Sequence, residues 1–356
     1  MALWTWLIPL AATLLLGATF ALPMGLLLGL ACVAALIGAV IASVHHAEVV
    51  AHRVGEPFGT LALALAITVI EVALILSVML AASEGGKASL ARDTIFAAVM
   101  LITTGVVGIC VLVGALHHHT QRFNLEGAYS ALAALVALAG LSLVLPTFTT
   151  SSPAGTYTDS QLAFVALSSL ALWLAFVFVQ TVRHRDYFLP VVNAADEAIH
   201  ATPPSSALAW ASFGLLLVSL VVVVGLAKQL SPSIEAAVTA AGAPKAVIGI
   251  VIAMLVLLPE TWAAVRAARA DRLQTSMNLA LGSALASIGL TIPAVVVAAV
   301  WLDLPLVLGL EAKDITMLAL AFLVSSITLG TGRTNVLLGA VHLVLFAAFL
   351  FLAFVP

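Results

Sequence analysis

Two glutamates stand alone inside long apolar segments of this 356-residue sequence. Glu71 lies in LALALAITVIEVALILSVML and Glu260 in VIGIVIAMLVLLPETWAAV. At a helical rise of about 1.5 Å per residue, each lies roughly fifteen residues into its segment and so near a bilayer midplane. An ionised carboxylate there is costly and marks a functional site. Two such carboxylates at matching depth could hold protons or a cation, which predicts an exchange of one for the other.

The two carboxyl groups would behave as a pair if they shared one pocket. Burial favours the neutral form of a carboxyl group, and a neighbouring carboxylate favours it further. The pair would then titrate as a unit and hold protons while no cation is bound. A divalent cation reverses this balance, and Ca²⁺ takes about six to eight oxygen ligands. We therefore expect Glu71 and Glu260 to be the catalytic residues and the metal ligands, and to bind protons or the cation in mutually exclusive fashion.

The residues before Glu71 offer further ligands. Gly55, Glu56 and Pro57 predict a bent or broken start of the helix, which would free backbone carbonyls for a cation. Glu56 is a candidate for attracting cations at the cytoplasmic mouth. Thr68 precedes Glu71 by three residues and so shares its helix face. Its hydroxyl would face the carboxyl group or the ion, or would bond back to its own helix.

The segment that carries Glu260 contains a proline immediately before the glutamate. Pro259 donates no backbone hydrogen bond, and its ring disturbs the preceding turn. Carbonyls near Val256 are therefore candidate cation ligands. A purely structural kink is the alternative.

Small and polar residues within later apolar segments supply uncharged oxygens. They are Asn278, Ser283 and Ser287 in the second half of the chain, and Thr103 and Thr104 at the matching place in the first. Ser283 and Ser287 lie four residues apart and share a helix face. These five residues are cation-binding candidates, and ordinary packing between close helices is the alternative.

Seven of the nine histidines fall into three groups. They are His45, His46 and His52, then His117, His118 and His119, and, alone in the last apolar segment, His342. In the first group, His45 and His52 share a helix face with Glu48, and the group is either a regulatory metal or pH-sensing site or a solvated helix end. The second is either a weak metal site or an exposed cap. His342 either relays protons or packs against a serine or a backbone carbonyl.

The amino-acid composition is that of a protein embedded in a membrane. Hydrophobic residues make up 63% of the chain and charged residues only 8%, against about 25% charged residues in soluble domains. We therefore expect an integral membrane protein whose partners are the lipid bilayer, small inorganic cations and protons, with no cofactor. The net charge of −3, without a basic stripe, is too small to indicate nucleic acid or an anionic surface as a partner. Cys32 and Cys110 lie in apolar runs and are expected to be buried small side chains.

Eleven apolar runs approach the roughly 20 residues that a membrane-spanning helix needs. We expect an all-α polytopic membrane protein with spans at 3–20, 24–44, 57–82, 93–116, 127–146, 161–182, 207–228, 245–267, 274–302, 313–331 and 335–354. The first run lacks the positive residues of a secretory signal, so we keep it as a span.

The positive residues predict an orientation. Of the 13 Lys and Arg residues, eight fall on the side of the N-terminus and five on the other, namely Lys87, Arg92, Lys228, Lys245 and Lys313. Positive residues favour the cytoplasm, so we expect the N-terminus inside and the C-terminus outside. Arg266, Arg269 and Arg272 contribute most to the difference.

A polar stretch, RHRDYFLPVVNAADEAIHATPPSS, divides the chain into halves with five spans on either side, apart from the first span. An odd number of spans per half reverses the second half, which is the inverted-repeat plan of many secondary transporters. We expect an extra helix at 1–22, repeats at 23–183 and 207–356, and a cytoplasmic linker at 184–206. The two α-repeats that carry the site would cover 55–116 and 245–302.

The two glutamate segments resemble a known family. GEPFGTLALALAITVIEVAL and the run from Glu260 to Gly282-Ser283 are similar to the two α-repeats of the calcium:cation antiporter superfamily, in its bacterial ChaA/CAX-type branch. The resemblance implies eleven helices, a ten-helix inverted-repeat core and one catalytic glutamate per repeat, at Glu71 and Glu260. It implies a transporter of the bacterial inner membrane and not an enzyme. The sequence also lacks the His-Glu-x-x-His and Gly-x-Ser-x-Gly patterns of hydrolases.

The sequence departs from the superfamily at the glutamates themselves. TVIE and LLPE replace the usual Gly-Asn-Ala-x-Glu, and Thr103-Thr104 stands where Gly-Ser is common. Loss of the asparagine amide, a possible ligand, could change which cation the site prefers. We expect exchange of cytoplasmic Ca²⁺ for external protons by alternating access, with Na⁺ or K⁺ as additional substrates. A Na⁺(K⁺)/H⁺ antiporter with little Ca²⁺ activity, a cation channel and a structural scaffold are the rivals, and the sequence sets no oligomeric state.

Overall fold

The structure, a computed structural model, describes residues 3–55, 58–81, 88–189 and 204–355, with the backbone alone for 58–64 and 81. Glu56 and most of the linker lie outside the described residues. The described elements are helical, apart from one isolated bridge between Arg122 and Arg333. They form two compact units, the first from Met1–Leu90 and His200–Val256, the second from Ala91–Ile199 and Leu257–Pro356.

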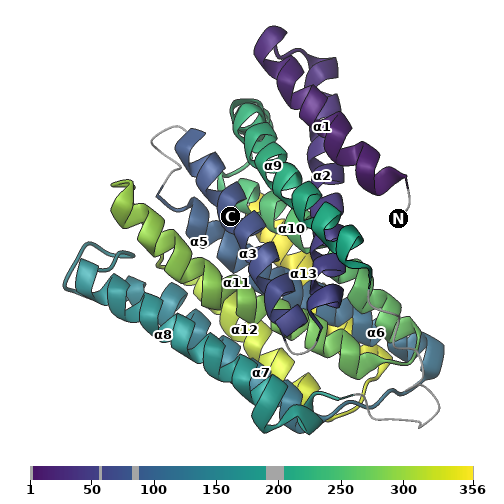
Figure 1. The fold of residues 1–356 in the computed structure, drawn as a ribbon. Helices are drawn as coiled ribbons and strands as arrows, with labels where there is room; N and C mark the ends of the chain where they lie inside the picture. Colours follow the sequence, from purple (N-terminus) through teal and green to yellow (C-terminus); the bar gives the residue numbers. More distant parts are fainter. Residues whose placement is uncertain (1–2, 56–57, 82–87, 190–203, 356) are drawn as a thin grey trace. The chain divides into compact units, whose positions relative to one another are not determined.

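The first unit contains α1 (Trp4–Ala21), α2 (Leu26–Val54), α3 (Phe58–Ala81), α9 (Ser206–Ala240) and the first half of α10 (Ala246–Arg269). The helix α2 packs against α3 and α9, and α1 packs against α2 and α9 (Figure 1). A Cβ atom at Gly225 of α9 would lie 2.6 Å from Leu16 Cδ2 of α1. Glycine therefore permits the close approach of these two helices.

The second unit contains α5 (Leu90–Met100), a π-helical turn (Leu101–Val106), α6 (Val107–His118), α7 (Leu125–Ala139), α8 (Asp159–Phe178), the second half of α10, α11 (Leu273–Trp301), α12 (Ala312–Leu329) and α13 (Val336–Phe354). In this unit α11 packs against α7 and α8, and α13 packs against α6. A Cβ atom at Gly339 of α13 would lie 2.6 Å from the backbone nitrogen of Leu112 in α6. This crossing brings one backbone against another, as small residues allow in membrane helices.

The predicted number of helices is confirmed, whereas the limits of two of them differ from the prediction. In the described part of the chain, ten helical segments are long and apolar enough to cross a membrane. The helix α3 is the eleventh, and its described apolar part, Leu65–Leu80, is shorter than those ten segments. The spans predicted at 24–44 and 207–228 were too short, because α2 continues to Val54 and α9 to Ala240. Both helices exceed the roughly 20 residues that a bilayer needs, so hydropathy located only their most apolar part.

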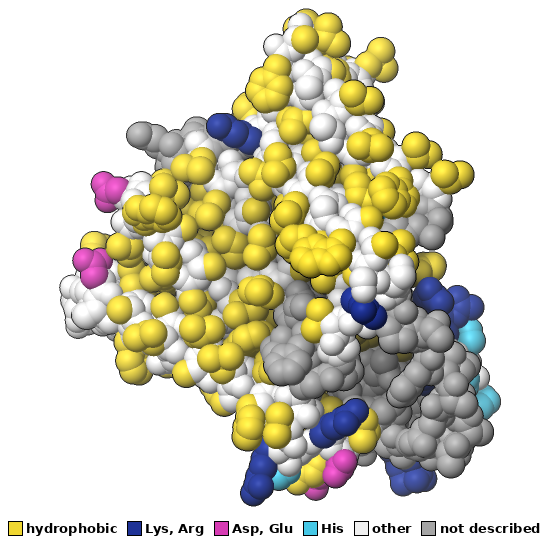
Figure 2. Space-filling model, viewed as in Figure 1, with side chains coloured by type: hydrophobic (Ala, Val, Ile, Leu, Met, Phe, Trp, Pro, Cys, Tyr) yellow, Lys and Arg dark blue, Asp and Glu magenta, His cyan; other side chains and the backbone are white. Residues whose placement is uncertain are grey.

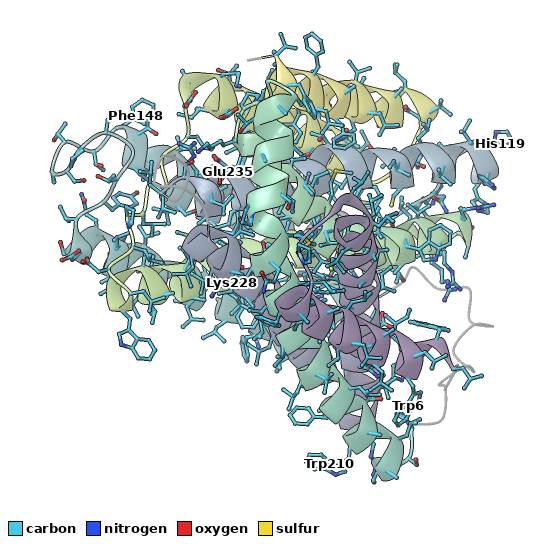
Figure 3. All side chains as sticks on the ribbon, turned by 90° about the horizontal axis from the view of Figure 1, so that it is seen from above. Trp6, His119, Phe148, Trp210, Lys228 and Glu235 are labelled. Carbon is cyan, nitrogen blue, oxygen red and sulfur yellow. The ribbon has the colours of Figure 1, made fainter. Side chains whose placement is uncertain are left out.

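Two details follow from this extra length. Lys228, which the sequence assigned to a loop, lies inside α9 (Figure 3). His46, which the sequence placed in a solvated helix end or a metal site, is fully buried in α2. Its Nε2 donates a hydrogen bond to the carbonyl of Thr5 at 2.9 Å, so α1 covers this part of α2.

Apolar side chains cover much of the visible surface, as a lipid environment requires (Figure 2). The indole of Trp210, near the start of α9, is 72% exposed and points away from the helices in Figure 3. Trp301, at the end of α11, is 85% exposed. Such amphipathic rings are favoured at the interface between the membrane and water.

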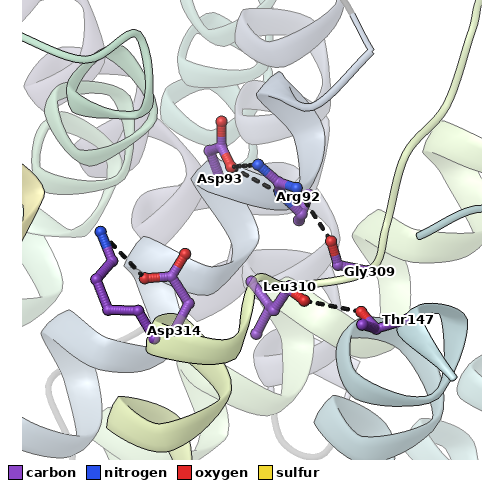
Figure 4. Close-up of polar contacts among 7 residues, drawn as sticks. Arg92, Asp93, Thr147, Gly309, Leu310 and Asp314 are labelled. Carbon is purple, nitrogen blue, oxygen red and sulfur yellow. Dashed lines mark hydrogen bonds and ion pairs between the residues drawn. The ribbon is translucent and has the colours of Figure 1, made fainter. Parts of the chain in front are cut away.

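Hydrogen bonds join the loops at each end of the second unit. At one end, Gln121 donates from its backbone nitrogen to Thr334 Oγ1 at 2.9 Å and from Nε2 to the carbonyl of Ala268 at 2.8 Å. At the other end, Arg92 Nη1 donates to the carbonyl of Gly309 at 3.0 Å (Figure 4). Loops that alternate along the chain therefore gather at the same end, as spans that cross one after another require. Which end faces the cytoplasm stays a prediction.

Candidate functional site

Glu71 lies near the middle of α3 and is only 2% exposed. Thr68, one turn earlier, is buried as well, so the face that the two residues share is a buried face. Their neighbours Ile70 and Leu74 are also buried and apolar. A carboxyl group in such surroundings needs a proton, a cation or hydrogen-bond donors, because burial of an isolated charge is costly.

Glu260 lies in α10 and is half-buried. The helix continues through Pro259, although proline removes one backbone donor from its ladder. Thr261 Oγ1 donates to the carbonyl of Leu257 at 2.8 Å, within the same helix. Val256 is buried, and the carbonyls proposed as ligands near it belong to a helical turn rather than to a broken segment.

The side chains of Ser283 and Glu260 meet across two helices. Ser283 Oγ on α11 donates a hydrogen bond to Glu260 Oε2 on α10. Ser283 is half-buried, and Ser287, one turn further along α11, is buried. The arrangement places a neutral hydroxyl on the carboxylate, which is the type of oxygen that completes a cation site beside an acid.

Asn278 has a different set of partners. Its Nδ2 donates to the carbonyl of Phe188 at 2.6 Å, and its Oδ1 accepts from Gln274 Nε2 at 2.9 Å. The amide thus ties α11 to the segment that follows α8. Of the three candidates on α11, Ser283 contacts the glutamate, whereas Asn278 ties α11 to the segment that follows α8.

Thr103 and Thr104 lie in the π-helical turn between α5 and α6 and are fully buried. Their hydroxyls donate to the carbonyls of Val99, at 2.7 Å, and Met100. The protons of these hydroxyls are therefore used within the same helix, which is the bonding pattern that competes with a ligand role. Both hydroxyl oxygens keep acceptor capacity but have no proton to offer a neighbour.

His342 on α13 is fully buried and contacts the same turn. Its Nδ1 donates to the carbonyl of Thr103 at 2.8 Å, and its Nε2 lies 3.0 Å from Thr328 Oγ1 on α12. A carbonyl can only accept, so Nδ1 carries a proton, and in the neutral ring the hydroxyl of Thr328 donates to Nε2. The structure thus supports the packing interpretation of His342. No pattern in the sequence singled out Thr328.

Two of the other described histidines contact aromatic or backbone groups. The rings of Trp4 and His45 lie with their centroids 5.3 Å apart and their planes tilted by 52°. His118 Nε2 donates a hydrogen bond to the carbonyl of Arg269 at 2.9 Å. Over the described ranges of the chain, no three His, Cys, Asp or Glu side chains gather closely enough to hold a metal ion. A site that holds a transported ion with only two carboxylates would not count as such a group of three.

The two glutamates belong to different units, Glu71 to the first and Glu260 to the second. Their convergence on one site stays a prediction. Glu56, the candidate for attracting cations, lies outside the described residues. The structure therefore shows two separate arrangements, a buried carboxyl group on α3 and a carboxyl group with its hydroxyl partner on α10 and α11.

Solved structures of similar fold include the structure of native YfkE, with a TM-score of 0.76 and 16% identity over 99% of this chain and 100% of that one. The crystal structure of the H⁺/Ca²⁺ exchanger CAX gives a TM-score of 0.70 and 14% identity over 98% of this chain and 88% of that one. At these identities the likeness shows the fold alone.

Two curated relatives align with nearly the whole sequence. The y4hA protein of Sinorhizobium fredii is 49% identical, over 99% of this chain and 96% of the relative. The sodium-potassium/proton antiporter ChaA of Escherichia coli is 34% identical, over 95% of this chain and 92% of the relative. The sequence profile of the sodium/calcium exchanger protein family matches residues 21–182 and 211–355. These matches cover most of the chain, which therefore belongs to the sodium/calcium exchanger protein family.

Proposed function

We propose that this protein is a secondary antiporter that exchanges a cation for protons, with Glu71 and Glu260 binding both in turn. The observation that carries the proposal is the burial of Glu71, whose side chain is 2% exposed inside a membrane-spanning helix. Glu260, bonded to Ser283 in the second unit, is a second acid within a span. Membrane proteins keep such acids where ions or protons travel.

Mutually exclusive occupancy would link the two fluxes. When the carboxyl groups lose their protons, the buried negative charge is disfavoured unless a cation neutralises it. The protein therefore switches between its inward-facing and outward-facing conformations with either protons or the cation bound. The state in which both carboxylates are charged and no ion is bound is rarely populated. Hydroxyl oxygens of Thr68, Ser283 and Ser287 are the neutral ligands that we assign to the bound cation.

The family profile supports a repeated architecture. It matches two stretches, 21–182 and 211–355, which agree closely with the proposed repeats 23–183 and 207–356. The first helix lies almost entirely outside both stretches, as an addition to a ten-helix core would. Each stretch contains one of the two glutamates. We propose that the repeats are inverted and rock about the glutamates to expose the site to either side of the bacterial inner membrane.

Ca²⁺ is the first candidate cation, because two carboxylates neutralise a divalent ion and the structurally similar CAX is an H⁺/Ca²⁺ exchanger. A second candidate is exchange of Na⁺ or K⁺ for protons. The observation that favours it is the 34% identity to the sodium-potassium/proton antiporter of Escherichia coli, which is higher than the 14% identity to CAX.

The test is ion exchange by purified protein in liposomes that enclose a pH-sensitive dye. With a proton gradient imposed, external Ca²⁺, Na⁺ or K⁺ should discharge it, and the cation that does so at the lowest concentration is the preferred one. Glu71→Gln and Glu260→Gln should each abolish the signal, since either change removes a charge that must alternate between proton and cation. Glu126→Gln is the matched control, because Glu126 is exposed at the start of α7.

Wild-type exchange by either Glu71→Gln or Glu260→Gln would remove the site assignment. A channel makes a different prediction for the same vesicles. Its cation flux would carry no protons in the opposite direction, so cation entry would not be coupled to discharge of the proton gradient.

A further inference from the structure

A pocket of about 480 Å³ opens at the turn between α10 and α11. Its polar lining comes from Arg266, Arg269, Arg272 and Thr275, and its apolar lining from alanines of α10 and from Leu279. We propose that this pocket binds the phosphate headgroup of an anionic phospholipid. The inference does not depend on the transport cycle.

The turn that carries these arginines is fixed from its other side. Gln121 Nε2 donates to the carbonyl of Ala268 at 2.8 Å and to Asp271 Oδ1 at 2.9 Å. His118 Nε2 donates to the carbonyl of Arg269 at 2.9 Å. Asp271 itself adopts a φ of 57°, a left-handed conformation that these bonds hold in place. The backbone beneath the pocket is therefore preorganised, which lowers the entropy cost of binding.

The charges in the pocket call for an anion. All three arginines are exposed, and within the described ranges none of them forms an ion pair. Asp271, the acid in the same turn, accepts a hydrogen bond from Gln121. Guanidinium groups present planar forks of donors that match the oxygens of a phosphate group.

The location of the pocket favours a lipid headgroup as its ligand over a soluble anion. It lies at the end of a membrane-spanning helix, where the phosphate groups of a bilayer lie. Trp262, about one turn before Arg266 on α10, is 67% exposed, as expected for a side chain at the lipid interface. The apolar part of the lining, with Leu279, suits the first carbons of an acyl chain. A bound lipid would brace the junction of α10 and α11, the helices that Ser283 and Glu260 join.

The test compares two double variants that each remove two positive charges. Arg266→Gln with Arg269→Gln changes the pocket, and Arg183→Gln with Arg185→Gln changes two exposed arginines outside it. The full-length protein is purified in detergent, and its Tm is measured with added dioleoylphosphatidylglycerol, dioleoylphosphatidylcholine or inorganic phosphate. Phosphatidylglycerol should raise the Tm of the wild type and of the Arg183/Arg185 variant by about 2 °C or more, because a ligand of the folded state stabilises it.

The same lipid should leave the Tm of the Arg266/Arg269 variant unchanged, and phosphatidylcholine should shift none of the three proteins. An equal shift in the pocket variant would overturn the proposal. Inorganic phosphate that reproduces the shift would also overturn it, since the pocket would then be a site for a soluble anion. A second measurement needs no variant: in native mass spectrometry the wild type should retain phosphatidylglycerol in preference to phosphatidylcholine, and the absence of a preference would contradict the assignment.

Discussion

The hydroxyl of Ser283 on α11 donates a hydrogen bond to the Oε2 atom of Glu260 on α10. The two residues are 23 positions apart in the sequence and come from consecutive membrane-spanning helices. The bond gives the half-buried carboxylate a neutral partner. Because the hydroxyl carries no charge, it does not neutralise the carboxylate in place of a cation. The hydroxyl oxygen remains an acceptor and can itself face the ion.

Removal of this hydroxyl should weaken cation binding. Ser283→Ala deletes a hydrogen bond to a charged group, an interaction of about 1.5–3 kcal/mol, so the apparent KM for the cation should rise roughly tenfold or more. Ser283→Thr keeps the hydroxyl and should stay close to the wild type. Initial rates of cation-dependent proton movement in liposomes measure the effect, and equal KM values for the wild type and Ser283→Ala would contradict a role for the pair.

The buried imidazole of His342 should matter for stability. His342→Ala leaves the carbonyl of Thr103 and the hydroxyl of Thr328 without the partner they have in the structure, and it also opens a cavity. Unsatisfied buried groups and lost packing each cost about 1–3 kcal/mol. The Tm in detergent should fall by about 4 °C or more.

His342→Gln offers both a donor and an acceptor and should recover part of that loss in Tm. If His342→Ala kept the Tm of the wild type, the network between the π-helical turn, α12 and α13 would not stabilise the fold.

The crossing of α13 and α6 should not tolerate a side chain at Gly339. A methyl group there would meet the backbone of Leu112 at 2.6 Å, and a backbone in a packed helix cannot give way as the tip of a side chain does. Gly339→Ala should destabilise the protein by about 1–3 kcal/mol. Gly140→Ala is the control, because a Cβ atom at Gly140 meets nothing within 4 Å. Thermal unfolding in detergent compares the two variants, and equal Tm values would mean that the helices can separate at no cost.

The number and type of elements could be predicted from the sequence, because the thickness of a bilayer fixes the length of an apolar run. For α10 the predicted limits 245–267 and the observed Ala246–Arg269 nearly coincide. Hydropathy does not show where a helix ends in water or against another helix. The continuation of α2 past residue 44 is stabilised by packing instead, since His46 and Ala47 are buried and Thr5 of α1 accepts the hydrogen bond from His46.

The candidate site was predictable in part. Glu71 and Glu260 stand out because each is an acid in an apolar run, and Ser283 stands out because it is a small polar residue inside a span. The partners of Asn278 were not predictable, since its amide bonds to the carbonyl of Phe188, which is 90 positions away. The π-helical turn at Thr103 was not predictable either, because hydrophobic periodicity does not distinguish one extra residue in a buried helix.

The central claim is that protons and the cation exchange on Glu71 and Glu260. Isothermal titration of the detergent-solubilised protein with Ca²⁺, and with Na⁺ or K⁺, in two buffers of different ionisation enthalpy measures the protons that binding releases. The wild type should release protons on binding its preferred cation, and Glu71→Gln and Glu260→Gln should each lose both the binding and the release. Cation binding without proton release, or unchanged release in either variant, would contradict the account.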